Sequence, residues 1–335
     1  MIKILPILFV ILVLLLIGNF YYEKTTLTSK SFTIGVSFSP DRARNLSLDW
    51  KITYLNILDN LKVRNLRLGS YWSTLQPSPE QYYFDDLDYQ INQAQKYNTQ
   101  VLLVLGAKQP GWPECYAPAW AKSLTLTQRQ QKSLDFIQTV VERYRANSSI
   151  KAWQVENEPL FAFGAVFSFG YQCDSQDGNF LKQEIALVKK LDPTRPVVVT
   201  DSGELSTWVG AMQASDIFGT TMYRTVHNPI FGYSTYPLSP SFYTLRSNLI
   251  RNLFARNNQK TIITELQAEP WFSEPSNQVP VNTQADIFSA QNLTENVDYA
   301  KKTGFDEVYL WGVEWWYYMA KNGHPEYLNL AKKLF

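Results

Sequence analysis

The sequence predicts an α/β protein built as a (β/α)₈ TIM barrel, preceded by an apolar N-terminal segment. Short apolar runs alternate with segments of helical period over about 300 residues, which is the size of one such barrel. Long loops follow the third, fourth, sixth and seventh runs, which would place them on one face of a barrel. An open doubly wound sheet is the alternative. It is disfavoured because no glycine-rich phosphate loop follows any run.

Eight runs are predicted as parallel strands, at 32–37, 64–69, 100–106, 151–158, 196–201, 216–222, 261–265 and 306–312. Apolar stripes of helical spacing lie between them, at 87–94, 134–141, 181–191 and 245–253. The last stripe consists of Leu245, Leu249 and Leu253. Each stripe is expected to pack against the sheet.

Residues 1–24 are predicted as a transmembrane anchor or signal segment, and residues 25–335 as one barrel domain. The apolar stretch from Ile4 to Tyr22 is about long enough to cross a bilayer. Lys3 precedes it, which favours a cytoplasmic N-terminus, and no small-residue cleavage site follows it. We therefore expect a membrane-anchored chain with its domain outside the cytoplasm. A cleaved signal peptide, which would leave the domain secreted, is the alternative.

Composition limits the classes of molecule that the protein is expected to bind. The formal net charge is +1, which gives no electrostatic case for binding nucleic acid. Two cysteines, Cys115 and Cys173, favour a disulfide in an exported protein, with two free thiols as the alternative. The cysteines and the two histidines show no metal-ligand spacing, so no metal and no organic cofactor is expected. We expect a monomer.

Two glutamates that end apolar runs carry the functional prediction. Glu158 stands in Asn157-Glu158-Pro159, and Glu265 follows Thr264 at the end of the seventh run. Cleavage of a glycosidic bond uses two such carboxyl groups. One protonates the leaving oxygen and the other attacks the anomeric carbon.

Asn157-Glu158-Pro159 at the end of the fourth run resembles the Asn-Glu-Pro signature of the clan A glycoside hydrolases, the retaining (β/α)₈ enzymes. In that clan the acid/base glutamate ends strand four and the nucleophile ends strand seven. The resemblance implies Glu158 as the acid/base and Glu265 as the nucleophile. It also implies two carboxyl groups about 5 to 5.5 Å apart.

The resemblance extends to four further residues. Asn157 resembles the asparagine that binds the sugar 2-hydroxyl, and Arg67 the strand-two arginine that keeps the nucleophile ionised. Tyr223 resembles the tyrosine that hydrogen-bonds the nucleophile, although Thr221 stands where the clan often has histidine. Trp311 resembles the tryptophan under the cleaved sugar. The alternatives are an interior ion pair for Arg67 and a core role for Trp311.

Other residues are weaker candidates. Trp72 is predicted to contact substrate, and further tryptophans could shape binding subsites: Trp112, Trp120, Trp271, Trp315 and Trp316. Glu156 is expected to share the strand face of Glu158, as a supporting group or paired with a cation. Glu269 is expected to contact substrate or cap a turn, and it is the next candidate nucleophile.

The sequence therefore predicts a retaining glycoside hydrolase that acts on an oligosaccharide or polysaccharide and contacts a membrane through its N-terminal helix. A transglycosylase of envelope polysaccharide that uses the same glutamates is one alternative. A glycan-binding barrel without turnover is another. A lyase or aldolase barrel is a third alternative, and it would need a lysine that forms a Schiff base at a strand end. Lys108 is the only lysine just past a predicted strand, and nothing else in the sequence supports this alternative.

Overall fold

A computed structural model describes residues 32–111, 113–161, 173, 177–228, 232–256, 258–272 and 274–335. Within these ranges eight parallel strands close into a barrel in the order β1-β10-β9-β6-β5-β4-β3-β2. They are β1 (Thr33–Phe38), β2 (Asn65–Gly69), β3 (Gln100–Leu105), β4 (Ile150–Val155), β5 (Val197–Asp201), β6 (Ile217–Met222), β9 (Lys260–Gln267) and β10 (Glu307–Trp311). Each overlaps one predicted run, so the predicted barrel is confirmed.

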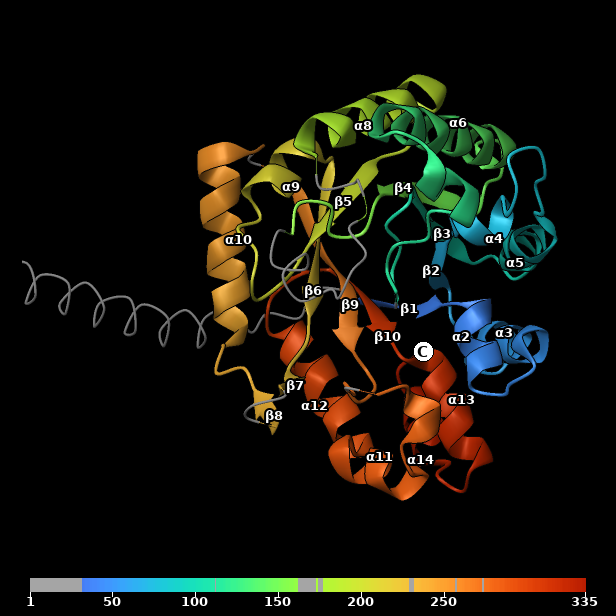
Figure 1. Ribbon diagram of the computed structural model, residues 1–335. Helices are drawn as coiled ribbons and strands as arrows, with labels where there is room; N and C mark the ends of the chain where they lie inside the picture. The colour runs from blue at the N-terminus through green and yellow to red at the C-terminus, as the bar shows by residue number, and fades with distance from the viewer. Residues whose placement is uncertain are drawn as a thin grey trace, which may run out of the picture.

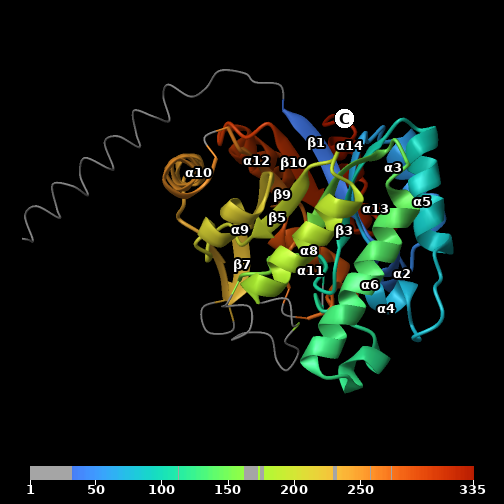
Figure 2. The ribbon, with the colours of Figure 1, turned by 90° about the horizontal axis from the view of Figure 1, so that it is seen from above.

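Helices surround the strands (Figures 1 and 2). They are α2 (Pro40–Asn45), α3 (Trp50–Asp59), α4 (Trp72–Leu75), α5 (Asp85–Lys96), α6 (Leu126–Tyr144), α8 (Gly178–Leu191), α9 (Val209–Ala214), α10 (Pro240–Phe254), α11 (Val281–Ile287), α12 (Ala290–Lys301), α13 (Val313–Lys321) and α14 (Glu326–Ala331). A small antiparallel hairpin of β7 (Thr225–Asn228) and β8 (Gly232–Thr235) follows β6, where the sequence predicts only a loop.

No helix in the described ranges is long and apolar enough to span a bilayer. The predicted membrane segment, residues 1–24, lies outside those ranges.

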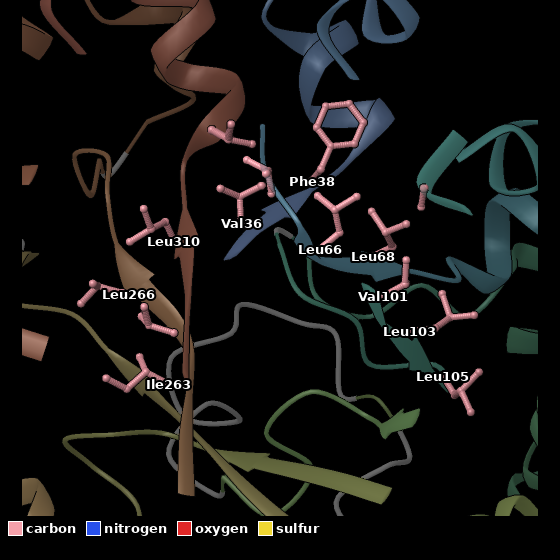
Figure 3. Packing of buried hydrophobic residues seen from close by; sticks show 14 of the residues in the cluster. Val36, Phe38, Leu66, Leu68, Val101, Leu103, Leu105, Ile263, Leu266 and Leu310 are labelled. Carbon is pink, nitrogen blue, oxygen red and sulfur yellow. The ribbon is translucent and has the colours of Figure 1, made fainter. Parts of the chain in front are cut away.

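Apolar side chains project from both the outer and the inner face of the barrel sheet. Alternate strand residues point to opposite faces. One set packs outward against the helices, and Figure 3 shows its members from five strands: Val36, Phe38, Leu66, Leu68, Val101, Leu103, Leu105, Ile263, Leu266 and Leu310. A smaller set forms a separate cluster from the alternate positions: Leu102, Ala152, Val198, Ile262 and Tyr309. The second set fills the barrel interior, and polar residues take the interior positions nearer the carboxyl ends of the strands.

Helices α6 and α8 lie side by side, and α8 packs against β4 (Figures 1 and 2). Helix α6 begins at a capping box in which the side chains of Thr125 and Gln128 each accept the other's backbone N–H. Helix α8 begins at Asp177, whose side chain accepts from the backbone of Asn179. These caps set where the two helices begin.

The predicted packing of the stripe on α10 is wrong. Leu245, Leu249 and Leu253 are 41%, 59% and 63% exposed. The helix instead buries the face that carries Tyr243 and Ile250. Leucines four residues apart define a helix face, but their spacing does not say which face meets the sheet.

Candidate active site

The chain turns sharply after β4, where the Asn-Glu-Pro motif lies. The strand ends at Val155, three residues before the predicted end at Glu158. Glu156 and Glu158 have φ values of 58° and 46°, a left-handed conformation that is rare for residues with side chains and marks functional or strained sites. The two glutamates therefore sit on a bend, and the expectation that they share a strand face is wrong.

Glu156 ties this bend to the loop after β3. Its carboxyl accepts the backbone N–H groups of Ala107 at 2.8 Å and Lys108 at 2.5 Å. The Asn157 N–H donates to the Lys108 carbonyl at 2.8 Å, and the Lys108 ammonium donates to the Glu158 carbonyl at 3.0 Å. Of the two roles expected for Glu156, the structure shows the supporting one, in which backbone amides take the place of a cation.

A disulfide joins the same two segments. Cys115, in the loop after β3, is bonded to Cys173, in the segment after β4. Lys108 and Cys115 also form an isolated antiparallel bridge within the β3 loop. The loop that carries Lys108 is therefore fixed by hydrogen bonds on one side of the Glu158 bend and by a covalent bond on the other.

Glu158 lies in surroundings that favour a protonated carboxyl. It is 9% exposed, and burial raises its pKa well above the usual value of a glutamate. The positive charge of Lys108 opposes this shift, and the negative charge of Glu265 adds to it. A carboxyl that keeps its proton near neutral pH can act as a general acid.

Glu265 reaches the barrel interior because β9 carries a bulge. Thr220 of β6 pairs with Ile263, and the next residue, Thr221, pairs with Glu265, so Thr264 is an extra residue. Ile263 points to the outer cluster. Strict alternation would turn Glu265 outward as well, and the extra residue turns it inward.

Arg67 links the two glutamate-bearing segments. It is 1% exposed. Its Nη1 donates to Glu265 Oε1 at 2.7 Å and its Nη2 to Asn157 Oδ1 at 2.7 Å. Its Nε donates to Gln154 Oε1 at 2.8 Å. Because a guanidinium only donates, it must meet the oxygen of Asn157, which leaves the Asn157 amide nitrogen as a donor for a ligand.

Tyr223 holds the second oxygen of the same carboxylate. Its hydroxyl donates to Glu265 Oε2 at 2.8 Å, so Arg67 and Tyr223 each bind one oxygen. The Tyr223 backbone N–H donates to Glu204 at 3.0 Å, and its ring makes an edge contact with Trp271 at 4.9 Å. Glu265 is therefore held in one orientation, as an attacking carboxylate requires.

Trp311 stands half-buried at the end of β10, where it pairs with Gln267 of β9, the strand that carries Glu265. A Cβ placed on Gly111 would lie 3.3 Å from its ring, so the loop after β3 approaches it closely. The Arg42 guanidinium lies 5.7 Å from the ring centroid on a different element, α2. The indole is thus enclosed between loops at the carboxyl ends of the barrel strands.

The predicted substrate contact of Trp72 is wrong. Trp72 is 0% exposed, and its indole N–H donates to Gln76 at 2.8 Å. Its ring packs against Trp120 and Phe136. The residue belongs to the core beneath α4, because its side chain points toward α6 and away from the barrel mouth.

The other tryptophans that were predicted to shape subsites include both core residues and an exposed residue. Trp315 and Trp316 lie in α13 and are 0% exposed, so they too are core residues. Trp271 is 44% exposed beside Tyr223 and stays a candidate for substrate binding. Trp112 lies outside the described residues.

Sequence reasoning missed several members of this site. Gln154 lies two residues after Ala152, which faces the barrel interior, and accepts from Arg67, so alternation along β4 could have indicated it. Thr200 on β5 accepts the Glu158 N–H at 2.8 Å. Glu269 forms an ion pair with Arg42, whereas Glu265 binds Arg67 and Tyr223. In the described ranges no group of three or more histidine, cysteine, aspartate or glutamate residues could hold a metal ion.

Comparisons with known proteins agree with the barrel fold. Residues 105–265 match the model of the TIM barrel domain of glycosyl hydrolases family 2. That stretch contains Glu158 and ends at Glu265. No curated protein matches the sequence.

Solved structures share the fold at low sequence identity. A β-galactosidase from Marinomonas ef1 matches with a TM-score of 0.55 and 15% identity, over 83% of this chain and 54% of that one. A GH5_18 protein from Streptomyces cattleya in complex with GlcNAc matches with 0.58 and 14%, over 85% and 71%. An exo-β-1,4-mannosidase from Opitutaceae bacterium strain TAV5 matches with 0.56 and 10%, over 84% and 51%. The chain spans about half the length of the galactosidase and the mannosidase.

Proposed function

We propose that the chain is a retaining glycosidase of the clan A type, acting on an oligosaccharide or polysaccharide; its eight-stranded barrel and the family 2 glycosyl hydrolase match over residues 105–265 support this. Glu265 is the nucleophile and Glu158 the acid/base. Asn157 and Trp311 bind the sugar at the cleaved bond, while Arg67 and Tyr223 hold the nucleophile in position.

The observation that carries the proposal is the contrast between the two carboxyl groups. Arg67 and Tyr223 bind both oxygens of Glu265. Glu158 is buried at the other strand end, with its pKa raised by that burial. One carboxyl is thus held by two donors in a fixed orientation, as a nucleophile requires, and the other is suited to keep a proton, as a general acid requires.

The reaction follows from these states in two steps. In the first, Glu265 attacks the anomeric carbon while Glu158 gives its proton to the leaving oxygen, and a glycosyl ester forms at Glu265. In the second, Glu158, now ionised, takes a proton from water as the water attacks the same carbon and releases Glu265. The Asn157 amide is a donor for the sugar 2-hydroxyl in both steps.

A panel of nitrophenyl glycosides and polysaccharides tests the proposal, using the parent, Glu158→Ala, Glu265→Ala and a surface control, Glu142→Ala. The parent and the control should turn over the same substrate at the same rate. Glu265→Ala should show no turnover. Glu158→Ala should lose about 10²–10⁴-fold where the leaving group needs a proton, and far less with a dinitrophenyl leaving group.

Two results would contradict the proposal. Full activity in Glu265→Ala would remove the nucleophile. Binding of glycan by the parent with no turnover across the panel would favour a glycan-binding barrel. Analysis of products with and without added sugar acceptors separates hydrolysis from transglycosylation on the same two glutamates.

For location, we propose that residues 1–24 anchor the chain and that the barrel lies outside the cytoplasm. The length of the apolar stretch from Ile4 to Tyr22 supports this. The full chain should stay with membranes after a carbonate wash, and a chain lacking residues 1–24 should not. A full chain released by carbonate, or found shortened at its N-terminus, would favour secretion.

A further inference from the structure

Three charged side chains that the proposed reaction does not use gather beside Trp311. Glu269 follows β9, Glu314 lies in α13 after β10, and Arg42 lies in α2 after β1. The strands β9, β10 and β1 are neighbours in the barrel. Their carboxyl ends therefore bring the three residues to one side of the site.

Glu269 and Arg42 form the reachable part of this group. Arg42 forms an ion pair with Glu269, and its Nε lies 3.9 Å from Glu314 Oε2. The side chains of Arg42, Glu269 and Glu314 are 27%, 8% and 2% exposed. Glu314 is fixed from behind, because its Oε1 accepts the Ser39 N–H at 2.6 Å. Glu314 therefore backs the pair, and a ligand would meet Arg42 and Glu269.

The pair also lies near the proposed nucleophile. Burial raises the pKa of the Tyr223 hydroxyl, and the negative charges of Glu265 and Glu269 add to that shift. Arg42 lies 5.7 Å from the centroid of Trp311. Its Nε is buried and has no hydrogen-bond acceptor in the described ranges. Because this Nε is buried, a ligand oxygen beside Trp311 would meet the exposed part of the Arg42 side chain, which is 27% exposed as a whole.

A guanidinium beside a carboxylate offers a donor and an acceptor at adjacent positions, which suits two neighbouring hydroxyls of a sugar ring. Each hydrogen bond to a charged group strengthens binding about 10- to 100-fold. Burial raises the pKa of Glu269 and raises that of Glu314 to about 7. At a pH above both values the group contains two carboxylates and one guanidinium, so a sugar that carries its own carboxylate would be repelled.

Resting on the proposed function, we propose that Arg42 and Glu269 are specificity-determining residues. They bind two adjacent hydroxyls of the sugar whose anomeric carbon Glu265 attacks, and they select a neutral sugar over a uronic acid.

The test compares the parent with Glu269→Gln, Arg42→Met and Arg42→Lys. The substrates share one aryl leaving group and differ in the sugar: the preferred neutral sugar, its monodeoxy analogues and its uronide. The parent should prefer the neutral sugar to the uronide at least tenfold. Glu269→Gln and Arg42→Met should each lower kcat/KM for the neutral sugar about 10- to 100-fold. One deoxy analogue lacks the hydroxyl that the substituted residue binds in the parent. On that analogue each variant should have the same kcat/KM as the parent.

Arg44→Met is the matched control, because Arg44 lies in the same helix and pairs with Asp41 and Asp86 on the outer surface. It should leave kcat/KM unchanged. The proposal is overturned if Arg42→Met behaves like this control, if the variants lose the same factor on every deoxy analogue, or if the parent prefers the uronide. Arg42→Lys keeps the positive charge beside Glu269, so it is the control for a loss of kcat/KM that comes from misfolding.

Covalent trapping with an activated 2-deoxy-2-fluoro glycoside separates this proposal from the function beneath it. A label on Glu265 in the parent and variants, without discrimination among the deoxy analogues, overturns the specificity proposal alone. A parent that neither turns over substrate nor takes a label overturns both.

Discussion

Arg67 and Glu265 form a buried ion pair across the barrel interior, with Nη1 and Oε1 2.7 Å apart. The arginine comes from β2 and the glutamate from β9, and these strands are separated in the barrel by β1 and β10. The contact exists because the bulge at Thr264 turns Glu265 inward. One guanidinium thus joins the proposed nucleophile to Asn157 of the acid/base motif.

Removal of Arg67 should destabilise the fold as well as the site. Arg67→Met leaves a buried carboxylate without its cation, which costs about 3–5 kcal/mol. The free energy of unfolding from chemical denaturation measures this. Arg67→Lys keeps the charge but loses the planar fork, so it should cost less stability and still lower kcat/KM. The exposed pair of Arg44 is the control, since Arg44→Met should cost about 0–1 kcal/mol. An Arg67→Met protein as stable as the parent would refute the claim.

The dependence of activity on pH should reveal the protonation state of Glu158, the proposed acid. Glu158 must be protonated to act, so activity should fall as pH rises through its raised pKa. Glu158→Gln cannot lose that proton, and its residual activity on a dinitrophenyl glycoside should lack this basic limb. The charge of Glu114 also raises the pKa of Glu158, so Glu114→Gln should move the limb to lower pH. A basic limb that persists unchanged in Glu158→Gln would assign the acid elsewhere.

Two tryptophans should separate stability from activity. Trp72→Ala removes a buried indole and should cost about 3–5 kcal/mol, with KM unchanged in the fraction that stays folded. Trp311→Ala should lower kcat/KM and leave the melting temperature nearly unchanged. Thermal melting and steady-state kinetics on the same preparations provide the comparison, and the opposite pattern would reverse the two assignments.

Adjacent residues on α10 should differ sharply. Leu249 is 59% exposed and Ile250 is 7% exposed. Leu249→Ala should change the free energy of unfolding by about 0.5 kcal/mol or less. Ile250→Ala should cost about 2–5 kcal/mol. Equal losses in the two variants would show that the leucine face is covered in solution.

Much of the fold was predictable because apolar runs and helical stripes report local burial. All eight barrel strands follow from such runs. The hairpin of β7 and β8 does not, because Thr225–Asn228 is short and polar. The helix face that carries Leu249 was assigned wrongly, since spacing does not reveal which side a helix buries.

The residues of the site that lie in a local sequence pattern could be predicted from the sequence. Glu158 and Glu265 were singled out because each ends an apolar run, and Asn157, Arg67 and Tyr223 by resemblance; the structure brings all five together. The pairing of Arg42 with Glu269 joins residues 227 positions apart, and no local pattern indicates it. The positive φ of Glu158 and the bulge at Thr264 are likewise features of the folded backbone, which residue identity alone does not specify.

The configuration of the first sugar released tests the central claim most directly. Proton NMR of the parent acting on its preferred aryl glycoside resolves the two anomers before they interconvert. Attack by Glu265 followed by water should give first the anomer that the substrate had. Release of the opposite anomer would mean that a single displacement by water occurs, and it would contradict the assignment of Glu265 as a nucleophile.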